Sequence, residues 1–164
     1  MTMLNITERI AEASRIDDYL ELPFDLRQRS RLRVMLRTGL EAALMLDRGT
    51  ILRGGDLLKA EDGKVIQVIA AEQPVHDVTA VSQQALMCAA YHLGNRHVPL
   101  QVGDGWLRLE QDHVLKEMLL GLGMHVIEKN SPFEPEAGAY GGGHRHSHDD
   151  CPSIKQPMRV RKIA

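Results

Sequence analysis

The chain of 164 residues is poor in cysteine and in aromatic side chains, and it has no long apolar run. Two cysteines cannot form the disulfide framework that stabilises many small secreted proteins. No segment approaches the roughly 18 uncharged apolar residues that a membrane helix needs. The first residues also lack the basic start and apolar run of a signal peptide. We therefore expect a cytoplasmic protein without a membrane partner.

A surplus of positive charge is missing as well. Lysine and arginine number 20 against 22 aspartate and glutamate, which gives a formal net charge of −2. A protein that neutralises many phosphates carries a clear basic excess, so we expect no nucleic-acid partner. Hydrophobic residues make up 43% of the chain, which is enough for the core of one ordinary domain or two small ones.

Residues 1–73 consist of short β-type runs that turn residues separate. The candidate strands are residues 20–26, 32–36, 44–46, 50–52 and 65–70. The intervening segments end in or contain glycines, which can adopt the positive φ of tight turns. This pattern predicts a small all-β domain of the sheet-on-sheet type.

Four arginines recur at every second position in this part of the chain: Arg27, Arg29, Arg31 and Arg33. In an extended strand, a period of two would place all four guanidinium groups on one face. Such a face is either a solvated surface answered by nearby carboxylates or a docking surface for an acidic partner protein. The sequence leaves both interpretations open.

Residues 74–131 alternate differently, with a boundary at Pro74. The helical period of 3.6 is clear in two segments, and Ser82 and Asp112 are suited to cap them. The expected elements are strands 75–80, 98–102, 106–109 and 124–128 and helices 82–93 and 112–120. The order β-α-β-β-α-β predicts a ferredoxin-like domain, so the whole chain is of the α+β class.

Residues 132–164 change in composition. Two prolines and several glycines precede a cluster of histidines, and so polar a stretch cannot bury enough apolar surface to offset its ordering entropy. We therefore predict a disordered C-terminal tail that contains histidine.

The histidine cluster is the strongest chemical signal, because His144, His146 and His148 alternate within five positions. Imidazole is largely unprotonated near neutral pH and is a good ligand for nickel, copper and zinc. Three such groups on one short segment can surround a single ion. Arg145 and Ser147 interrupt the cluster, unlike the unbroken run of an expression tag.

His97 is the second candidate ligand, in the loop that follows the first expected helix. One imidazole cannot hold a metal tightly, but a two-fold axis would bring a second copy alongside it. His113, at the start of the second expected helix, could add a further donor. The sequence shows no Cys-x-x-Cys pair, phosphate-binding glycine loop or nucleophile elbow, so we expect no enzyme.

The residues that carry these patterns resemble the UreE family of urease accessory proteins. The resemblance rests on residues 91–101, 112–115 and 132–140, and also on residues 29–33 and 48–56. It covers nearly the whole chain, including the histidine-containing tail.

The resemblance implies a nickel metallochaperone that works as a homodimer and delivers Ni²⁺ for assembly of the urease active site. In that family the histidine that matches His97 from each subunit shares one nickel ion. The family also implies an N-terminal domain that binds a peptide or partner, and a complex with the accessory GTPase and the urease apoprotein. On this basis we hypothesise that the tail captures Ni²⁺ and passes it to the paired His97 side chains.

The sequence departs from the family pattern at two places. Some members carry His-x-His where this chain has Gln111 and His113, so one imidazole of that site is missing. The tail has three histidines where some members have many, which argues against bulk storage of nickel.

Three other interpretations follow from the residues alone. The chain could be a protein-interaction adaptor or folding chaperone that works through the arginine face. It could handle Zn²⁺ or Cu²⁺, because ligand type alone places Cu²⁺ above Ni²⁺ in affinity. A hydrolase that uses His97 or His113 is the third.

Overall fold

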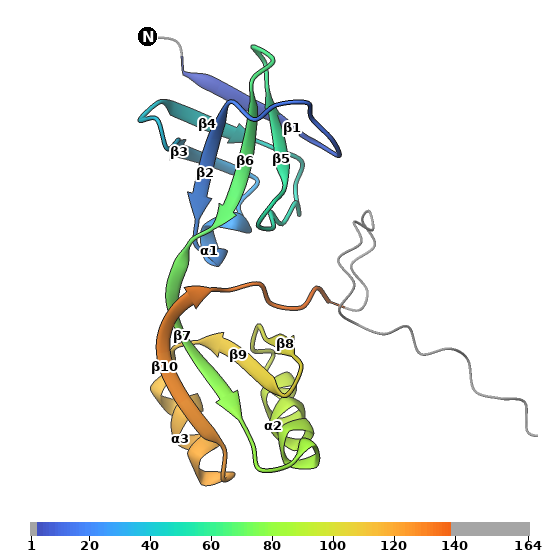
Figure 1. Ribbon diagram of the computed structural model, residues 1–164, viewed down its shortest axis with the longest axis vertical. Helices are drawn as coiled ribbons and strands as arrows, with labels where there is room; N and C mark the ends of the chain where they lie inside the picture. Colours follow the sequence, from blue (N-terminus) through green and yellow to red (C-terminus); the bar gives the residue numbers. More distant parts are fainter. Residues whose placement is uncertain (1–2, 139–164) are drawn as a thin grey trace, which may run out of the picture.

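The computed structural model describes residues 3–138, which form two regions joined end to end (Figure 1). We refer to residues 3–71 as the N-terminal region and to residues 72–138 as the C-terminal region. The N-terminal region contains β1 (Leu4–Ile10), β2 (Asp18–Leu22), α1 (Phe24–Arg27), β3 (Arg31–Met35), β4 (Glu41–Met45), β5 (Leu57–Ala60) and β6 (Val65–Ala70). The C-terminal region contains β7 (Glu72–Thr79), α2 (Gln83–Asn95), β8 (Gln101–Gly103), β9 (Trp106–Glu110), α3 (His113–Gly121) and β10 (His125–Pro132).

The N-terminal region is built on one hydrogen-bonded sheet with the strand order β2-β6-β5-β1-β4-β3. Strands β1, β3 and β4 cross β2, β5 and β6 at a steep angle (Figure 1), so the sheet curls around a single core. Inward-facing side chains alternate along the strands, as in Ala42 and Leu44 of β4 and Ile66 and Val68 of β6. The β-rich character expected from the sequence is confirmed.

Several details of this region differ from the sequence-based prediction. Strands β1 and β5 were not expected, and residues 50–52 form no strand. The expected strand 20–26 ends at Leu22, because Pro23 initiates the one-turn helix α1. Arg27 therefore lies on a helix, and the period-two arginine face is wrong for this residue.

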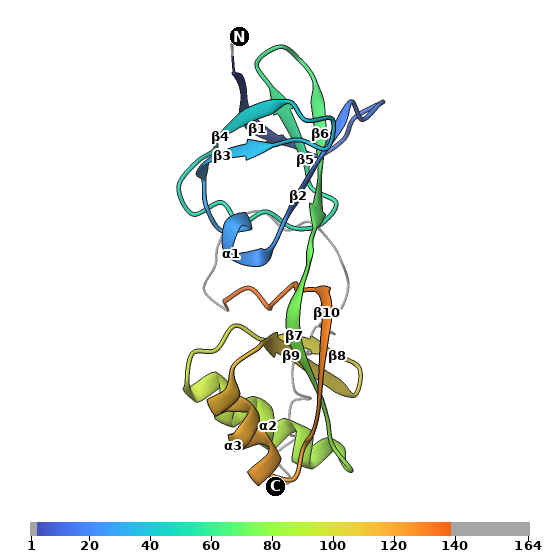
Figure 2. The ribbon, with the colours of Figure 1, turned by 90° about the vertical axis from the view of Figure 1, so that its left-hand side faces the viewer.

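The C-terminal region contains an antiparallel sheet with the order β10-β7-β9-β8, and α2 and α3 cover one of its faces (Figure 2). The two helices pack on the strands through Leu86, Ala89, Leu93 and Leu119, which are buried with Val78 and Leu107. No helix between residues 3 and 138 is both long and apolar enough to cross a membrane.

Both helices begin where the sequence predicts. The Ser82 hydroxyl accepts a hydrogen bond from the Ala85 amide at 3.1 Å, and the Asp112 carboxylate accepts one from the Leu115 amide at 2.9 Å. Each side chain satisfies an amide that the helix itself leaves without a partner. The predicted N-caps are confirmed.

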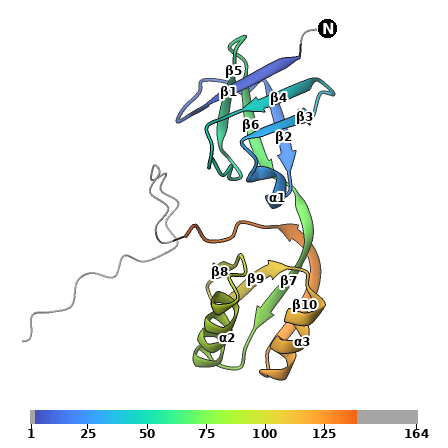
Figure 3. The same ribbon diagram turned by 180° about the vertical axis from the view of Figure 1, so that it is seen from behind.

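The two regions are joined by more than the β6–β7 connection. The chain after β10 turns back and runs between them (Figure 3), where Phe133 is fully buried. Phe133 packs edge to face on Phe24 of α1, with ring centroids 5.5 Å apart, and Val75 of β7 completes this small core. Residues 132–136, which the sequence assigns to a tail, are packed instead. The single apolar side chain of Phe133 fixes them to Phe24 and Val75, and the average composition of the segment does not reveal this contact.

Candidate metal centre

His97 follows the end of α2 and has an unusual backbone conformation. Its φ of 54° makes it the only non-glycine residue with positive φ among residues 3–138. The His97 amide donates to the Gly94 carbonyl at 3.0 Å, and the Val98 amide donates to the Leu93 carbonyl at 3.3 Å. These two bonds define a Schellman cap, in which His97 occupies the left-handed position that glycine usually takes.

This position exposes the imidazole. A side chain in the left-handed region costs about 1 kcal/mol relative to glycine, because its Cβ approaches the following carbonyl. Val98 packs against the core that contains Leu93, so the cap is fixed by an apolar contact as well. The fold therefore holds His97 at the surface in a defined place, although glycine would fit the backbone better. Gly94, three residues before His97, lies within the helix.

His113 is the first residue of α3 and is exposed. The preceding residue, Asp112, donates its amide to the Nε2 atom of the buried His76 at 3.1 Å. His76 therefore accepts through Nε2, and its Nδ1 atom is buried without a hydrogen-bond partner in the described part of the chain. No pattern in the sequence signals this link between His76 and the start of α3.

One copy of the chain does not assemble a metal site from its described residues. No group of three or more His, Cys, Asp or Glu side chains between residues 3 and 138 is arranged to hold an ion. His97 and His113 are thus single donors within one chain. The candidate ligands His144, His146 and His148 lie outside the described residues.

The outer face of α2, which ends at the His97 cap, exposes large apolar side chains. Met87 is 60% exposed and Tyr91 67% exposed, while Val81 precedes the helix and is 86% exposed. The core face of α2 consists of Leu86, Ala89 and Leu93, and Met87 is not part of it. An exposed apolar face next to a potential ligand is typical of an interaction surface.

The four arginines of the predicted docking face are separated by the fold. Arg27 is fully buried and cannot contact a partner, which corrects its assignment to the face. Arg29 lies in the exposed turn after α1, and Arg31 and Arg33 lie on the exposed side of β3, an edge strand of the sheet. None of these three guanidinium groups pairs with a carboxylate within the described chain.

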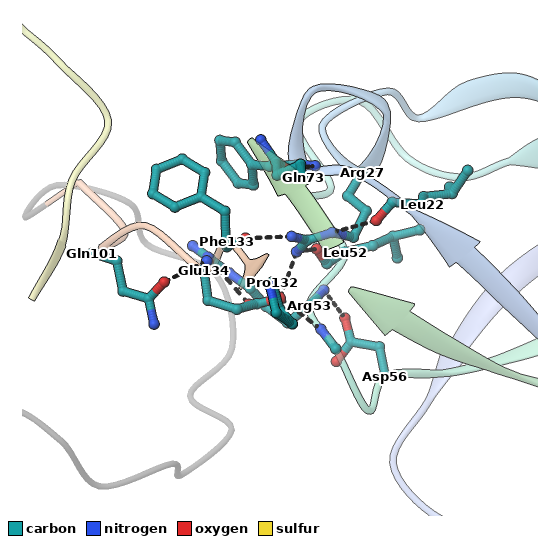
Figure 4. A network of polar contacts seen from close by, with 12 residues as sticks. Leu22, Arg27, Leu52, Arg53, Asp56, Gln73, Gln101, Pro132, Phe133 and Glu134 are labelled. Carbon is teal, nitrogen blue, oxygen red and sulfur yellow. Dashed lines mark hydrogen bonds and ion pairs between the residues drawn. The ribbon is translucent and has the colours of Figure 1, made fainter. Parts of the chain in front are cut away.

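The most extensive polar contact between the regions centres on Arg27 and Glu134 (Figure 4). Arg27 Nη1 donates to Glu134 Oε1 at 2.6 Å, and the Gly54 amide donates to the same oxygen at 3.1 Å. Burial lowers the pKa of the Arg27 guanidinium, and the Glu134 carboxylate opposes that shift. Sequence reasoning missed this pair; the only signal was the lone Phe133 beside two acidic residues in a Pro-rich segment.

The chain is similar to known proteins over most of its length. The family model for the N-terminal domain of the UreE urease accessory protein matches residues 5–71, and that for its C-terminal domain matches residues 73–156. A urease accessory protein UreE from Cupriavidus pinatubonensis is 59% identical over 130 residues, which span 79% of this chain and 59% of that protein.

Two further relatives match more of their own length. The urease accessory protein UreE of Nitrosospira multiformis is 48% identical over 148 residues, covering 90% of this chain and 84% of the relative. The urease accessory protein UreE of Alkalilimnicola ehrlichii is 53% identical over 140 residues, which span 85% of this chain and 86% of the relative. The chain, with its two matched regions and the His97 cap between α2 and β8, belongs to the UreE family of urease accessory proteins.

Proposed function

We propose that this chain is a nickel metallochaperone, not an enzyme, that binds Ni²⁺ as a homodimer and delivers it for urease maturation. The observation that carries the proposal is His97, an exposed imidazole held at a position where the backbone favours glycine. A strained and exposed residue is a sign of a function other than stability. The family membership identifies urease assembly as the process.

The proposed arrangement places one nickel ion on a two-fold axis, between the His97 side chains of two copies. An isologous interface repeats each residue of its surface, so a single histidine per chain becomes a pair. Met87 and Tyr91 supply the apolar surface that such an interface would bury. Two fixed imidazoles leave coordination positions open, so the ion can pass to an accepting protein more readily than from a closed site.

The tail histidines His144, His146 and His148 and the exposed His113 are proposed as additional nickel donors. In this scheme the tail captures Ni²⁺ and transfers it to His97, and the accepting partners are the accessory GTPase and the urease apoprotein. We also propose the division into an N-terminal domain (1–73), a ferredoxin-like metal-binding domain (74–131) and a tail (132–164) whose first residues, 132–136, are packed between the two domains. The strand order β10-β7-β9-β8 supports the ferredoxin-like assignment.

Calorimetric titration with Ni²⁺ tests this proposal in the full chain with His144, His146 and His148 replaced by alanine. We expect about one ion per two chains, because each chain contributes one imidazole to the shared site. His97→Ala should abolish this binding. His125→Ala is the matched control, since His125 is also exposed but lies at the start of β10. Equal binding by the His97 and His125 variants would reject His97 as the anchor.

The dimer requires its own test. Light scattering should give the mass of two chains, and Tyr91→Glu should shift it to that of one chain, because it places a charge in the apolar interface. Met45→Glu is the control, since Met45 is exposed in the N-terminal region. Competition among Ni²⁺, Zn²⁺ and Cu²⁺ separates a nickel carrier from a zinc- or copper-handling protein.

A second candidate function, that of a protein-interaction adaptor, is favoured by Arg29, Arg31 and Arg33. These exposed guanidinium groups have no carboxylate partner among the described residues, and β3 is a sheet edge. Reversing Arg31 and Arg33 to glutamate should weaken binding of an acidic partner and leave nickel affinity unchanged. Lys59→Glu on β5 is the control for the change in net charge.

A further inference from the structure

The segment that follows β10 contacts both regions, and we call residues 133–136 the strap. Its Glu134 carboxylate binds the N-terminal region, through Arg27 and the Gly54 amide and through Arg53, whose Nη1 atom lies 3.5 Å from Oε2. Its backbone binds the C-terminal region: the Glu134 amide donates to Gln101 Oε1 at 2.9 Å, and the Glu136 amide donates to the Leu100 carbonyl at 2.8 Å. The strap thus links the N-terminal region to the segment around Leu100 and Gln101 in the C-terminal region.

On the N-terminal side, the bridge depends on a buried cation. Arg27 is 0% exposed and donates to the Leu22 and Leu52 carbonyls at 3.1 Å each. Its remaining bonds go to the strap, to Glu134 and to the Phe133 carbonyl (Figure 4). Without the strap, this guanidinium would lose the only carboxylate that forms an ion pair with it among the described residues, and breaking such a pair is strongly unfavourable. The N-terminal region therefore holds the strap in place.

On the C-terminal side, the strap supports the His97 loop. The Schellman cap fixes the loop at His97 and Val98, and the strap fixes it at Leu100 and Gln101. Only Pro99 lies between these two fixed points. Gln101 is also the first residue of β8 and pairs with Arg108 of β9. The conformation that presents the imidazole is thus held from both ends, and the strap, which depends on Arg27, contributes to one of them.

We infer that Arg27 and Glu134 are positioning residues for His97, acting through the strap and residues 100–101. The inference rests on the proposed nickel function, and it adds that the N-terminal region contributes to the metal site without contacting the ion. Loss of the Arg27–Glu134 pair should let residues 98–101 move, and a mobile ligand binds its ion more weakly because binding must order it.

The test uses Glu134→Gln in the full chain with the three tail histidines replaced by alanine. The glutamine amide keeps the shape of the Glu134 side chain and one acceptor oxygen, but it removes the negative charge that pairs with Arg27. Glu117→Gln, on the exposed surface of α3, is the matched control. Gln101→Leu is a second variant, which removes the acceptor of the Glu134 amide and leaves the buried arginine intact.

Amide hydrogen exchange and Ni²⁺ titration are the two measurements. We expect exchange at Val98, Gln101 and Glu136 to accelerate about tenfold in both test variants, with nickel affinity about tenfold lower and no change in the control. Wild-type exchange at these amides, combined with a lower melting temperature, would overturn the inference, because the pair would then be merely structural. Faster exchange with unchanged nickel affinity would overturn the positioning role. If the parent chain bound no nickel, the proposed function would fail, and the exchange rates alone would decide whether the strap supports the loop.

Discussion

Helices α2 and α3 end in the same backbone geometry. They differ in the residue that occupies the position with positive φ, which is His97 after α2 and Gly123 after α3. After α3, the Gly123 amide donates to the Leu120 carbonyl and the Met124 amide to the Leu119 carbonyl, each at 3.0 Å, and Gly123 has a φ of 81°. After α2, His97 takes the place of Gly123 in the same pattern. Glycine adopts this conformation without a steric cost, and histidine does not.

The difference separates a cap that only ends a helix from a cap that also presents a side chain. Gly123 ends α3 without steric strain, because glycine has no Cβ, and it places no side chain at the surface. His97 ends α2 at a cost and places an imidazole at the surface, beside the exposed apolar face of Met87 and Tyr91. The strap supports the α2 end through Leu100 and Gln101, and the α3 end has no such support among the described contacts.

Removing the Arg27 side chain should have the largest effect on stability and on the difference between the two helix ends. We expect Arg27→Ala to lower the free energy of unfolding by about 3–5 kcal/mol, because it removes a fully buried side chain together with its hydrogen bonds to Leu22, Leu52 and the strap. In the folded state it should accelerate exchange at the His97 amide more than at the Gly123 amide. Urea unfolding and amide exchange measure the two quantities. Equal acceleration at both helix ends would contradict the asymmetry, and Arg31→Ala on the exposed face of β3 serves as the control.

Asp77 tests a contact in the sheet that carries both helices. The Arg108 guanidinium donates two hydrogen bonds to its carboxylate, and together with Lys129 it holds the pKa of Asp77 below the ordinary value. A lowered pKa in the folded state contributes stability at pH values above the unfolded pKa, and that contribution is lost as the pH falls through the folded pKa.

We therefore expect Asp77→Asn to reduce the free energy of unfolding by about 2 kcal/mol at neutral pH. The loss should shrink on acidification below about pH 4, where the unfolded aspartate of the parent protein is protonated. Both helix ends should be affected alike. A pH-independent difference between variant and parent would show that the charge of Asp77 is not the cause.

The cap of α3 should depend on its glycine. Gly123→Ala should lower the free energy of unfolding by about 1 kcal/mol, because alanine is strained at positive φ. Gly121→Ala is a close control: Gly121 is helical, and no atom lies within 4 Å of the position of an added Cβ. That variant should be slightly more stable than the parent, because alanine favours the helix over glycine, so the melting temperatures of the two variants should shift in opposite directions.

The cap of α2 should respond in the opposite sense. His97→Gly should raise the free energy of unfolding by about 0.5–1 kcal/mol by relieving the left-handed strain. The same variant should lose nickel binding, since the imidazole is gone. A stable variant that no longer binds the ion would separate function from folding at this residue, whereas a destabilised variant would show that the imidazole itself stabilises the loop.

Much of the C-terminal region could be predicted because its signals are local. Ser82 and Asp112 cap helices whose apolar residues repeat with a period near 3.6, and Gly105 has the positive φ of a tight turn between β8 and β9. Each signal lies within a few residues of the structure that it specifies. The predicted location of His97, in a loop after the first helix, was correct for the same reason, although its cap geometry was not foreseen.

The contacts that were missed are long-range. Arg27 shares its spacing with Arg29 and Arg31, and only the tertiary fold buries the first of them. Glu134 and Phe133 lie in a Pro-rich segment that composition assigns to a tail, but their partners are in α1, far away in sequence. Period and composition describe neighbours along the chain, so they contain no information on such pairs.

The joint built from Phe24, Val75 and Phe133 has a consequence for biosynthesis. Arg27 and the Phe133 carbonyl are 106 residues apart, so almost the whole described chain must be made before they can meet. During translation the N-terminal region emerges first, with a guanidinium whose counter-ion has not yet been synthesised. We expect the Arg27 guanidinium to stay hydrated on the ribosome until Phe133 and Glu134 have been synthesised. The core of the N-terminal region is then completed last, by residues from the end of the C-terminal region.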